Sequence, residues 1–112
     1  PQVASFGYSE AQAVQAGFQV RVGKFPFQAN GKALGYGEYG GYVKLITNAE
    51  DGQILGASIV GPDAAELLPE LTLAQVNKLP ASAIAANIHA HPTLSEAVLE
   101  AAEAALGHAI HI

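Results

Sequence analysis

Two apolar runs separated by an Asp-Gly turn constrain the fold of this chain more than any other feature of its sequence. Residues 42–47 and 53–60 are rich in β-branched and other apolar side chains, and Asp51-Gly52 lies between them. Asp-Gly favours a tight turn that joins neighbouring antiparallel strands. The sequence therefore predicts a β-hairpin, and with it an antiparallel sheet at the centre of the fold.

A short helix and a strand are predicted before this hairpin. Ser9 and Gln12 have the three-residue spacing of a capping box, and Gly17 follows as a left-handed stop, so we expect a helix between them. Apolar and polar side chains alternate from residue 18 towards residue 27, which indicates a half-buried strand. Pro26 cannot donate a backbone hydrogen bond, so it should lie at the edge or the end of that strand.

The segment between this strand and the hairpin is rich in glycine. Five glycines lie among aromatic and charged residues at positions 30–41. They lack the strand-then-helix frame of a phosphate-binding loop, so no nucleotide site is expected there. We expect a turn and loop region with one weak strand at 32–34.

A helix is predicted directly after the hairpin. Asp63 and Glu66 have capping-box spacing, and they open an amphipathic stretch that reaches Asn77. Pro69 lies inside this stretch, and an interior proline removes one backbone hydrogen bond. We therefore expect a bend or a break after the first turn of the helix.

Two further segments complete the pattern. Residues 80–86 predict a short helix or turn, and residues 94–106 predict a final helix that ends at Gly107. A helix, several strands with hairpin connections and then further helices are typical of an α+β domain. The expected fold is an antiparallel β-sheet with helices packed on one side.

Composition excludes several classes of protein. A length of 112 residues predicts one domain over residues 1–112, and a hydrophobic content of 50% is enough for a packed core. Five Lys and Arg against ten Asp and Glu give a net charge of -5, which argues against nucleic acid as a partner. The chain has no cysteine, so its own residues supply neither a disulfide framework nor thiolate chemistry. No apolar run is long enough to predict a membrane span.

Residues 89–96, His-Ala-His-Pro-Thr-Leu-Ser-Glu, bring titratable side chains and special backbone chemistry together. In one interpretation Thr93 is the N-cap of the last helix, and Glu96 completes a capping box. In the other, Pro92 turns the chain so that the His91 imidazole lies near the Glu96 carboxylate. A carboxylate on one ring nitrogen sets the tautomer and leaves the other nitrogen to act as general base and then general acid. The spacing permits both interpretations.

A metal site is a third interpretation of these residues. His89 and His91 are two residues apart, so on a strand they would face the same side and could chelate, with Glu96 or with His108 and His111. Neither a cysteine nor a third ligand at a recognised spacing supports this interpretation, so we expect no metal site.

The string at residues 89–96 resembles the C-terminal signature of dihydrolipoamide dehydrogenase, a member of the pyridine nucleotide-disulfide oxidoreductase family. The resemblance covers essentially all 112 residues, and only the interface, or dimerisation, domain of that family. A chain that opens on Pro1 and contains no methionine fits a piece of a longer protein. Supporting segments follow in the family's order at residues 1–10, 25–30, 41–44, 54–56, 61–62 and 66–67.

The resemblance implies a catalytic role for the final segment. In the family this domain joins two subunits and delivers a histidine to the active site of the partner subunit. His91 would be the acid/base residue between dihydrolipoamide and the redox disulfide, and Glu96 would orient and polarise it. The main chain at His91 and Pro92 would lie near the flavin of the partner subunit, and the His91-Pro92 peptide bond would be cis.

The resemblance also implies cofactors and partners. The parent enzyme would be a homodimer that uses FAD and NAD in domains absent from this chain, and this domain alone would bind neither and would be inactive. The peripheral subunit-binding domain of a dihydrolipoyl acyltransferase core, a basic domain, would dock near the dimer axis. The bacterial cytoplasm is the preferred location, and the mitochondrial matrix is the alternative. Two alternatives stay open: a stand-alone dimerising or partner-binding module, and the equivalent domain of another disulfide reductase such as glutathione reductase.

Overall fold

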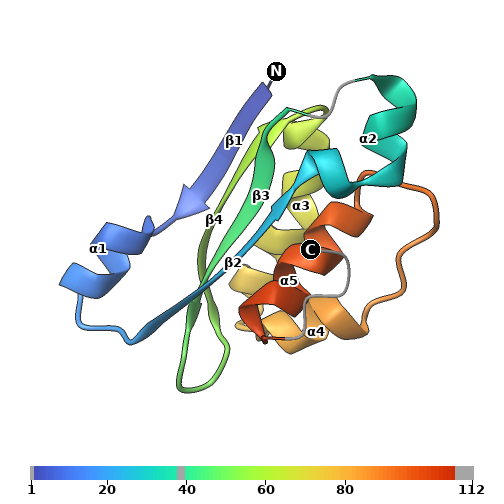
Figure 1. Cartoon of the computed structure of the whole chain (residues 1–112). Helices are drawn as coiled ribbons and strands as arrows, with labels where there is room; N and C mark the ends of the chain where they lie inside the picture. Colours follow the sequence, from blue (N-terminus) through green and yellow to red (C-terminus); the bar gives the residue numbers. More distant parts are fainter. Residues whose placement is uncertain (1, 38–39, 108–112) are drawn as a thin grey trace.

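A four-stranded antiparallel sheet forms the centre of the fold (Figure 1). The computed structural model describes residues 2–37 and 40–107. The strand order is β1-β4-β3-β2, so the first two strands of the sequence are the two edges of the sheet. The strands are β1 (Gln2–Gly7), β2 (Val20–Pro26), β3 (Tyr42–Asn48) and β4 (Ile54–Gly61).

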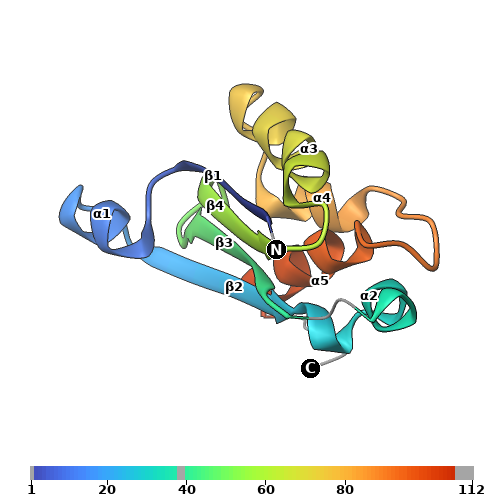
Figure 2. The same cartoon turned by 90° about the horizontal axis from the view of Figure 1, so that it is seen from above.

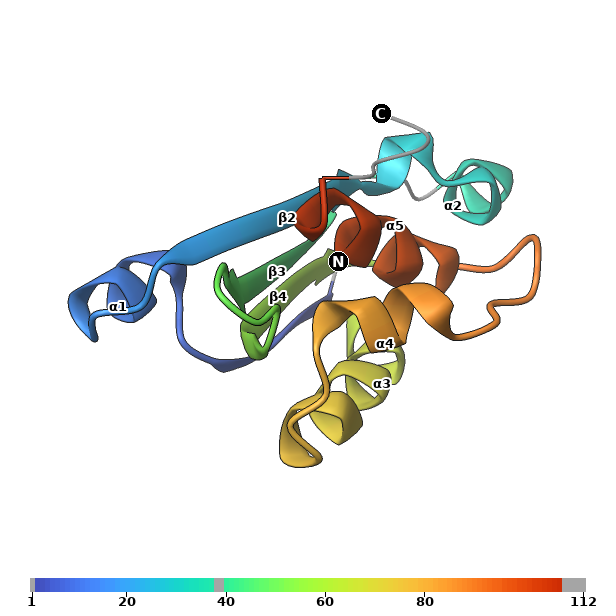
Figure 3. The same ribbon diagram turned by 90° about the horizontal axis from the view of Figure 1, so that it is seen from below.

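Three helices cover one face of this sheet (Figures 2 and 3). α5 packs on β2 and β3, α3 packs on β4 and β1, and α4 packs against α5. α1 lies apart from them, at one end of the sheet (Figure 1). The α+β fold with helices on one side of an antiparallel sheet is confirmed. The helices are α1 (Glu10–Gln15), the 3-10 turn η1 (Phe27–Ala29), α2 (Gly31–Tyr36), α3 (Ala64–Val76), α4 (Ala81–Ala86) and α5 (Glu96–Ala105).

The predicted hairpin is confirmed as β3 and β4. Val43 pairs with Ile59 and Lys44 pairs with Ser58, in antiparallel register. Val43 and Ile59 are fully buried beneath the helices, because alternate residues of a strand face opposite sides of the sheet. Gly52 has a φ of 77°, the positive value that the Asp-Gly turn requires.

Several of the other predicted elements are confirmed as well. The capping box of α1 is complete, with the Gln12 amide donating to Ser9 Oγ at 3.1 Å and the Ser9 amide donating to Gln12 Oε1 at 3.0 Å. Gly17 follows this helix with a φ of 97°. Pro26 is the last residue of the edge strand β2. None of the described helices has the length and apolar character to cross a membrane.

The glycine-rich segment contains a helix, and the predicted loop with a weak strand at 32–34 is wrong. α2 begins after Asn30, whose side-chain oxygen accepts the Ala33 amide at 2.9 Å. Ala33 is fully buried, so tertiary packing adds to this cap. Gly37 ends the helix with a φ of 75°. A buried cap and a buried alanine outweigh the low helix propensity of glycine in this short element.

The predicted helix after the hairpin is confirmed and ends at Val76, one residue before the predicted Asn77, but its predicted capping box and a break at Pro69 do not form. Asp63 has a left-handed φ of 53° and its side chain caps nothing, so the capping box with Glu66 does not form. Pro69 does not break the helix, since α3 is continuous over 13 residues. Pro69 and Ala65 are both exposed, so water can satisfy the Ala65 carbonyl that lost its donor.

Strand β1 has no counterpart among the predicted elements. It pairs along its whole length with β4, from Gln2 opposite Gly61 to Gly7 opposite Gly56. Its alternation is weak, because all six of its residues are exposed or half-buried. The partner strand therefore decides its structure, and periodicity within the segment does not reveal it.

Helix α5 lies very close to strand β2 at Gly23. This glycine is buried, and a Cβ placed on it would meet the Ala101 carbonyl and the Ala105 amide of α5. A glycine is therefore needed here for close backbone packing, and not for a positive φ. The same contact sets how closely α5 lies against β2.

Candidate functional site

His91 and Glu96 are in contact, as the second interpretation of residues 89–96 predicts. His91 lies in the loop of residues 87–95, here called the His91 loop, which joins α4 to α5 and projects beyond the helices (Figure 1). Glu96 is the first residue of α5. The His91 Nδ1 atom lies 2.9 and 3.0 Å from the two carboxylate oxygens of Glu96. The peptide bond between His91 and Pro92 is cis, as the resemblance implies.

The other interpretation, a capping box between Thr93 and Glu96, is half right. The Thr93 amide donates to Glu96 Oε1 at 2.9 Å, but Thr93 Oγ1 donates to the Ala90 carbonyl at 2.7 Å and caps no helix amide. The helix begins at Glu96 and not at Leu94, after an N-cap at Ser95 whose side chain bonds Thr93 Oγ1 at 2.9 Å and caps no helix amide. Glu96 therefore holds both His91 and the backbone of its loop, so the two roles coexist in one carboxylate.

A buried asparagine that the sequence analysis did not identify anchors the same loop. Asn30 Nδ2 donates to the Thr93 carbonyl at 3.0 Å, while its Oδ1 caps α2 through the Ala33 amide. Only 4% of Asn30 is exposed. An asparagine before Gly-Lys-Ala is a recognisable N-cap signal, but its second bond spans 63 residues and has no local signature.

Two substitutions of Asn30 should separate how much each of its two side-chain hydrogen bonds contributes to the free energy of unfolding. Asn30→Ala loses the cap and the bond to Thr93, and we expect it to lower the free energy of unfolding by about 2 kcal/mol. Asn30→Asp keeps an acceptor for Ala33 but loses the donor to Thr93, so a loss of about 1 kcal/mol is expected. Urea unfolding followed by circular dichroism measures both. Native stability of the aspartate variant would show that the bond to Thr93 contributes nothing.

The arrangement of His91 is suited to proton transfer. Nδ1 donates to a carboxylate, which sets the ring tautomer and leaves a lone pair on Nε2. Within the described ranges, Nε2 makes no hydrogen bond, and 77% of the side chain is exposed. A cleft of about 540 Å3 lies beside the pair, lined also by Phe25, Ala29, Asn30, Gly31, Leu99 and Glu100. The ring can therefore exchange a proton with a group outside this chain.

His89 and His91 do not form a chelating pair. The His89 Nε2 atom lies 2.7 Å from Glu70 Oε2 on α3, and Nδ1 bonds the Asn87 carbonyl at 2.9 Å. Among the described residues, no three His, Asp or Glu side chains are grouped to hold a metal ion. His108 and His111 lie outside the described residues.

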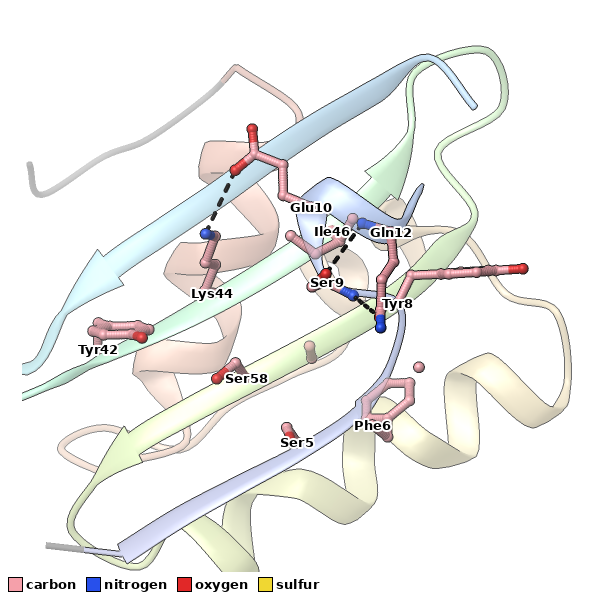
Figure 4. Close-up of a pocket in the computed structure, with 12 residues that line it drawn as sticks. Ser5, Phe6, Tyr8, Ser9, Glu10, Gln12, Tyr42, Lys44, Ile46 and Ser58 are labelled. Carbon is pink, nitrogen blue, oxygen red and sulfur yellow. Dashed lines mark hydrogen bonds and ion pairs between the residues drawn. The ribbon is translucent and has the colours of Figure 1, made fainter. Parts of the chain in front are cut away.

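A second pocket, of about 350 Å3, lies on the face of the sheet opposite the three helices (Figure 4). Lys44 and Glu10 line it and form an ion pair at 3.5 Å, and Ser5 and Ser58 are also among its lining residues. The residues that line it include neither a histidine nor a cysteine. It therefore offers no imidazole or thiol for proton transfer or nucleophilic attack, in contrast to the pair of His91 and Glu96.

Comparison with known proteins agrees with the fold and with the sequence signature. The profile of the pyridine nucleotide-disulphide oxidoreductase dimerisation domain matches residues 1–102. The chain is 54% identical over 111 residues to a dihydrolipoyl dehydrogenase of Mycobacterium tuberculosis, covering 99% of this chain and 24% of that protein. It is 51% identical over 112 residues to the dihydrolipoyl dehydrogenase of Bacillus subtilis, covering 100% of this chain and 24% of that protein.

Solved structures agree with this result. LpdA from Mycobacterium tuberculosis superposes with a TM-score of 0.85 at 25% identity, over 92% of this chain and 22% of that one. The HOCl-induced flavoprotein disulfide reductase RclA from Escherichia coli superposes with a TM-score of 0.82 at 27% identity, over 86% and 22%. The chain thus spans about a quarter of the length of these relatives. It belongs to the pyridine nucleotide-disulphide oxidoreductase family, as a dimerisation domain of the kind found in dihydrolipoyl dehydrogenases.

Proposed function

We propose that this domain supplies a His91-Glu96 acid/base pair to the partner subunit's active site in an enzyme that oxidises dihydrolipoamide with NAD. One observation carries the proposal: Nδ1 of His91 is held by Glu96 while the rest of the ring is open to the outside. Identities of 50% and more to dihydrolipoyl dehydrogenases favour this substrate over that of glutathione reductase.

The proton transfer follows from the two ring nitrogens. Nε2 of His91 accepts a proton from a thiol of the substrate, and the resulting thiolate attacks a disulfide sulfur. The ring then carries two protons, and the carboxylate of Glu96 stabilises this cation at 2.9 Å from Nδ1. The ring returns the proton to the thiolate that leaves the broken disulfide. The chain has no cysteine, so this disulfide belongs to another part of the enzyme.

The complete enzyme is proposed to bind FAD and NAD in domains other than this one. Bound FAD would supply the redox chemistry that links the dithiol to NAD. Residues 35–40 match the letters Gly-x-Gly-x-x-Gly, but Gly35 lies inside α2 and Gly37 ends it, whereas a dinucleotide site uses the N-terminus of a helix after a strand. The main chain at His91 and Pro92 is exposed, so it could contact one edge of the partner's flavin. It does not by itself form a flavin-binding site.

Partners and location form part of the same proposal. A homodimer brings His91 to the partner's disulfide, and the isolated domain is inactive because it lacks the thiols and both cofactors. The net charge of -5 suits a basic peripheral subunit-binding domain of an acyltransferase core. The proposed location is the bacterial cytoplasm. A stand-alone dimerising module without catalysis is the competing function, and the contact of His91 with Glu96 favours catalysis over it.

Chemical rescue tests the proposal directly. In the complete enzyme, His91→Ala removes the base. Added imidazole is expected to raise the turnover of dihydrolipoamide by this variant about tenfold. The reason is that a free imidazole can accept the thiol proton in place of the side chain. An alanine variant with near-native turnover would mean that His91 is not the base, and the stand-alone module would then be the better account.

Replacing Glu96 is expected to have a smaller effect on turnover than replacing His91. Glu96→Gln keeps an oxygen for the Thr93 amide and for Nδ1, but it loses the charge that stabilises the protonated ring. We expect turnover to fall about tenfold, with a stability loss of about 1 kcal/mol. Steady-state kinetics and thermal unfolding of the complete enzyme measure the two effects. A fall as large as that of an imidazole deletion would contradict this division of roles.

A further inference from the structure

A hydrogen-bonded cluster outside the proposed acid/base pair ties the His91 loop to helix α3. The cluster, here called the Glu70 cluster, consists of Glu70, Asn87 and His89. Glu70 Oε2 lies 2.7 Å from His89 Nε2 and accepts from Asn87 Nδ2 at 3.0 Å. His89 Nδ1 donates to the Asn87 carbonyl at 2.9 Å. A single carboxylate oxygen thus holds two side chains that are two residues apart in the loop.

The side chain of His89, the central residue of this cluster, is buried. Only 3% of the His89 side chain is exposed, and both of its ring nitrogens face acceptor oxygens. Because both partners accept, both contacts are hydrogen bonds when the imidazole carries both protons. Ile88, which lies between Asn87 and His89 in the sequence, is by contrast 93% exposed. The loop is therefore anchored at His89, while the Ile88 side chain directly before it points outwards.

His91 lies between two anchors of the loop. On its N-terminal side, two residues away, His89 is held by Glu70 of α3. On its C-terminal side, two residues away, Thr93 is held by Asn30 and by the Glu96 carboxylate. The proposed chemistry makes no use of Glu70 or His89. Their contact nevertheless joins the loop to α3 only two residues before His91.

We propose that Glu70 and His89 are positioning residues for His91. They hold the first half of the His91 loop against α3, so that Nδ1 of His91 stays on the Glu96 carboxylate while Nε2 faces the substrate. This inference rests on the proposed function. A displacement of about 1 Å in a reacting group can lower a rate by up to about a hundredfold, so a loop anchor two residues from the base has a measurable effect.

A double-mutant cycle in the complete enzyme tests this role. Glu70→Ala is expected to lower kcat for dihydrolipoamide about tenfold, with KM unchanged within about twofold, because the base and not substrate binding is misplaced. In the His91→Gln background, Glu70→Ala should change kcat by less than about twofold, since the residue that it positions is already absent. Glu66→Ala is the matched control, because Glu66 is exposed four residues earlier on α3, and native kcat is expected.

Amide hydrogen exchange supplies a readout that does not depend on turnover. Glu70→Ala is expected to speed exchange of amides in residues 87–95 about tenfold, and Glu66→Ala is expected to leave it unchanged. If Glu70→Ala does not fold, His89→Ala opens the same contact from the loop side, and the same results are expected.

The outcomes separate this inference from the proposed function. Near-native turnover of His91→Gln would overturn the proposed function and this inference with it. A large loss in His91→Gln combined with native kcat in Glu70→Ala would overturn the positioning role alone. If Glu70→Ala instead lowers kcat by the same factor in the native enzyme and in the His91→Gln variant, that result would also overturn the positioning role, because the effect would then not depend on His91.

Discussion

Turnover of dihydrolipoamide by the complete enzyme is expected to fall by about 10²- to 10⁴-fold when His91 is replaced by glutamine. Glutamine keeps a polar side chain of similar reach that can still contact Glu96. It cannot accept and return a proton near neutral pH, which is the one property that the proposed reaction requires of this residue. The loss should therefore appear in kcat, with little change in KM.

Two measurements control this experiment. Flavin content and the dimer mass, determined by absorbance and by light scattering, should equal those of the native enzyme, because the His91 side chain is 77% exposed and supports little packing within this chain. Electron transfer from reduced dinucleotide to an artificial one-electron acceptor should also be retained, since that route needs no thiol proton. Loss of both activities together would point to a damaged structure and would not support an acid/base role.

Gly23→Ala is expected to have the largest effect on stability, a loss of about 3 kcal/mol in the free energy of unfolding. The added Cβ meets backbone atoms of Ala101 and Ala105, which cannot turn aside as the end of a flexible side chain can. To accommodate it, α5 must move away from β2, and the contacts of buried Val98 and Ala102 are loosened. Urea unfolding of the chain, followed by circular dichroism, measures the change.

Gly35→Ala is the matched control for this substitution, with the opposite sign expected. Gly35 is exposed inside α2, a Cβ added to it would meet no atom of the described residues within 4 Å, and its φ is not positive. Alanine there restricts the unfolded chain and favours the helix, so we expect a gain of about 0.5–1 kcal/mol. Stabilisation by both substitutions, or no effect of Gly23→Ala, would show that α5 does not rest on β2 at Gly23.

The sequence alone determined those features whose chemistry lies within a few residues of chain. The turn at Gly52 and the capping box of Ser9 and Gln12 are local contacts, and both were predicted correctly. The apolar runs on either side of that turn predicted the hairpin of β3 and β4, and so the antiparallel sheet of the fold class. The contact of His91 with Glu96 spans five residues, and its prediction is confirmed as geometry while its catalytic role stays a prediction.

Only the tertiary structure decided the features that depend on residues far apart in the sequence. Edge strand β1 exists because β4 pairs with it, and α2 is held by Asn30, which also reaches Thr93 across 63 residues. The anchor of His89 on Glu70 joins residues 19 apart. A turn or a cap is decided by the conformational preferences of adjacent residues, so it can be read locally. A long-range hydrogen bond forms only after the whole chain has brought its partners together, and no local pattern encodes it.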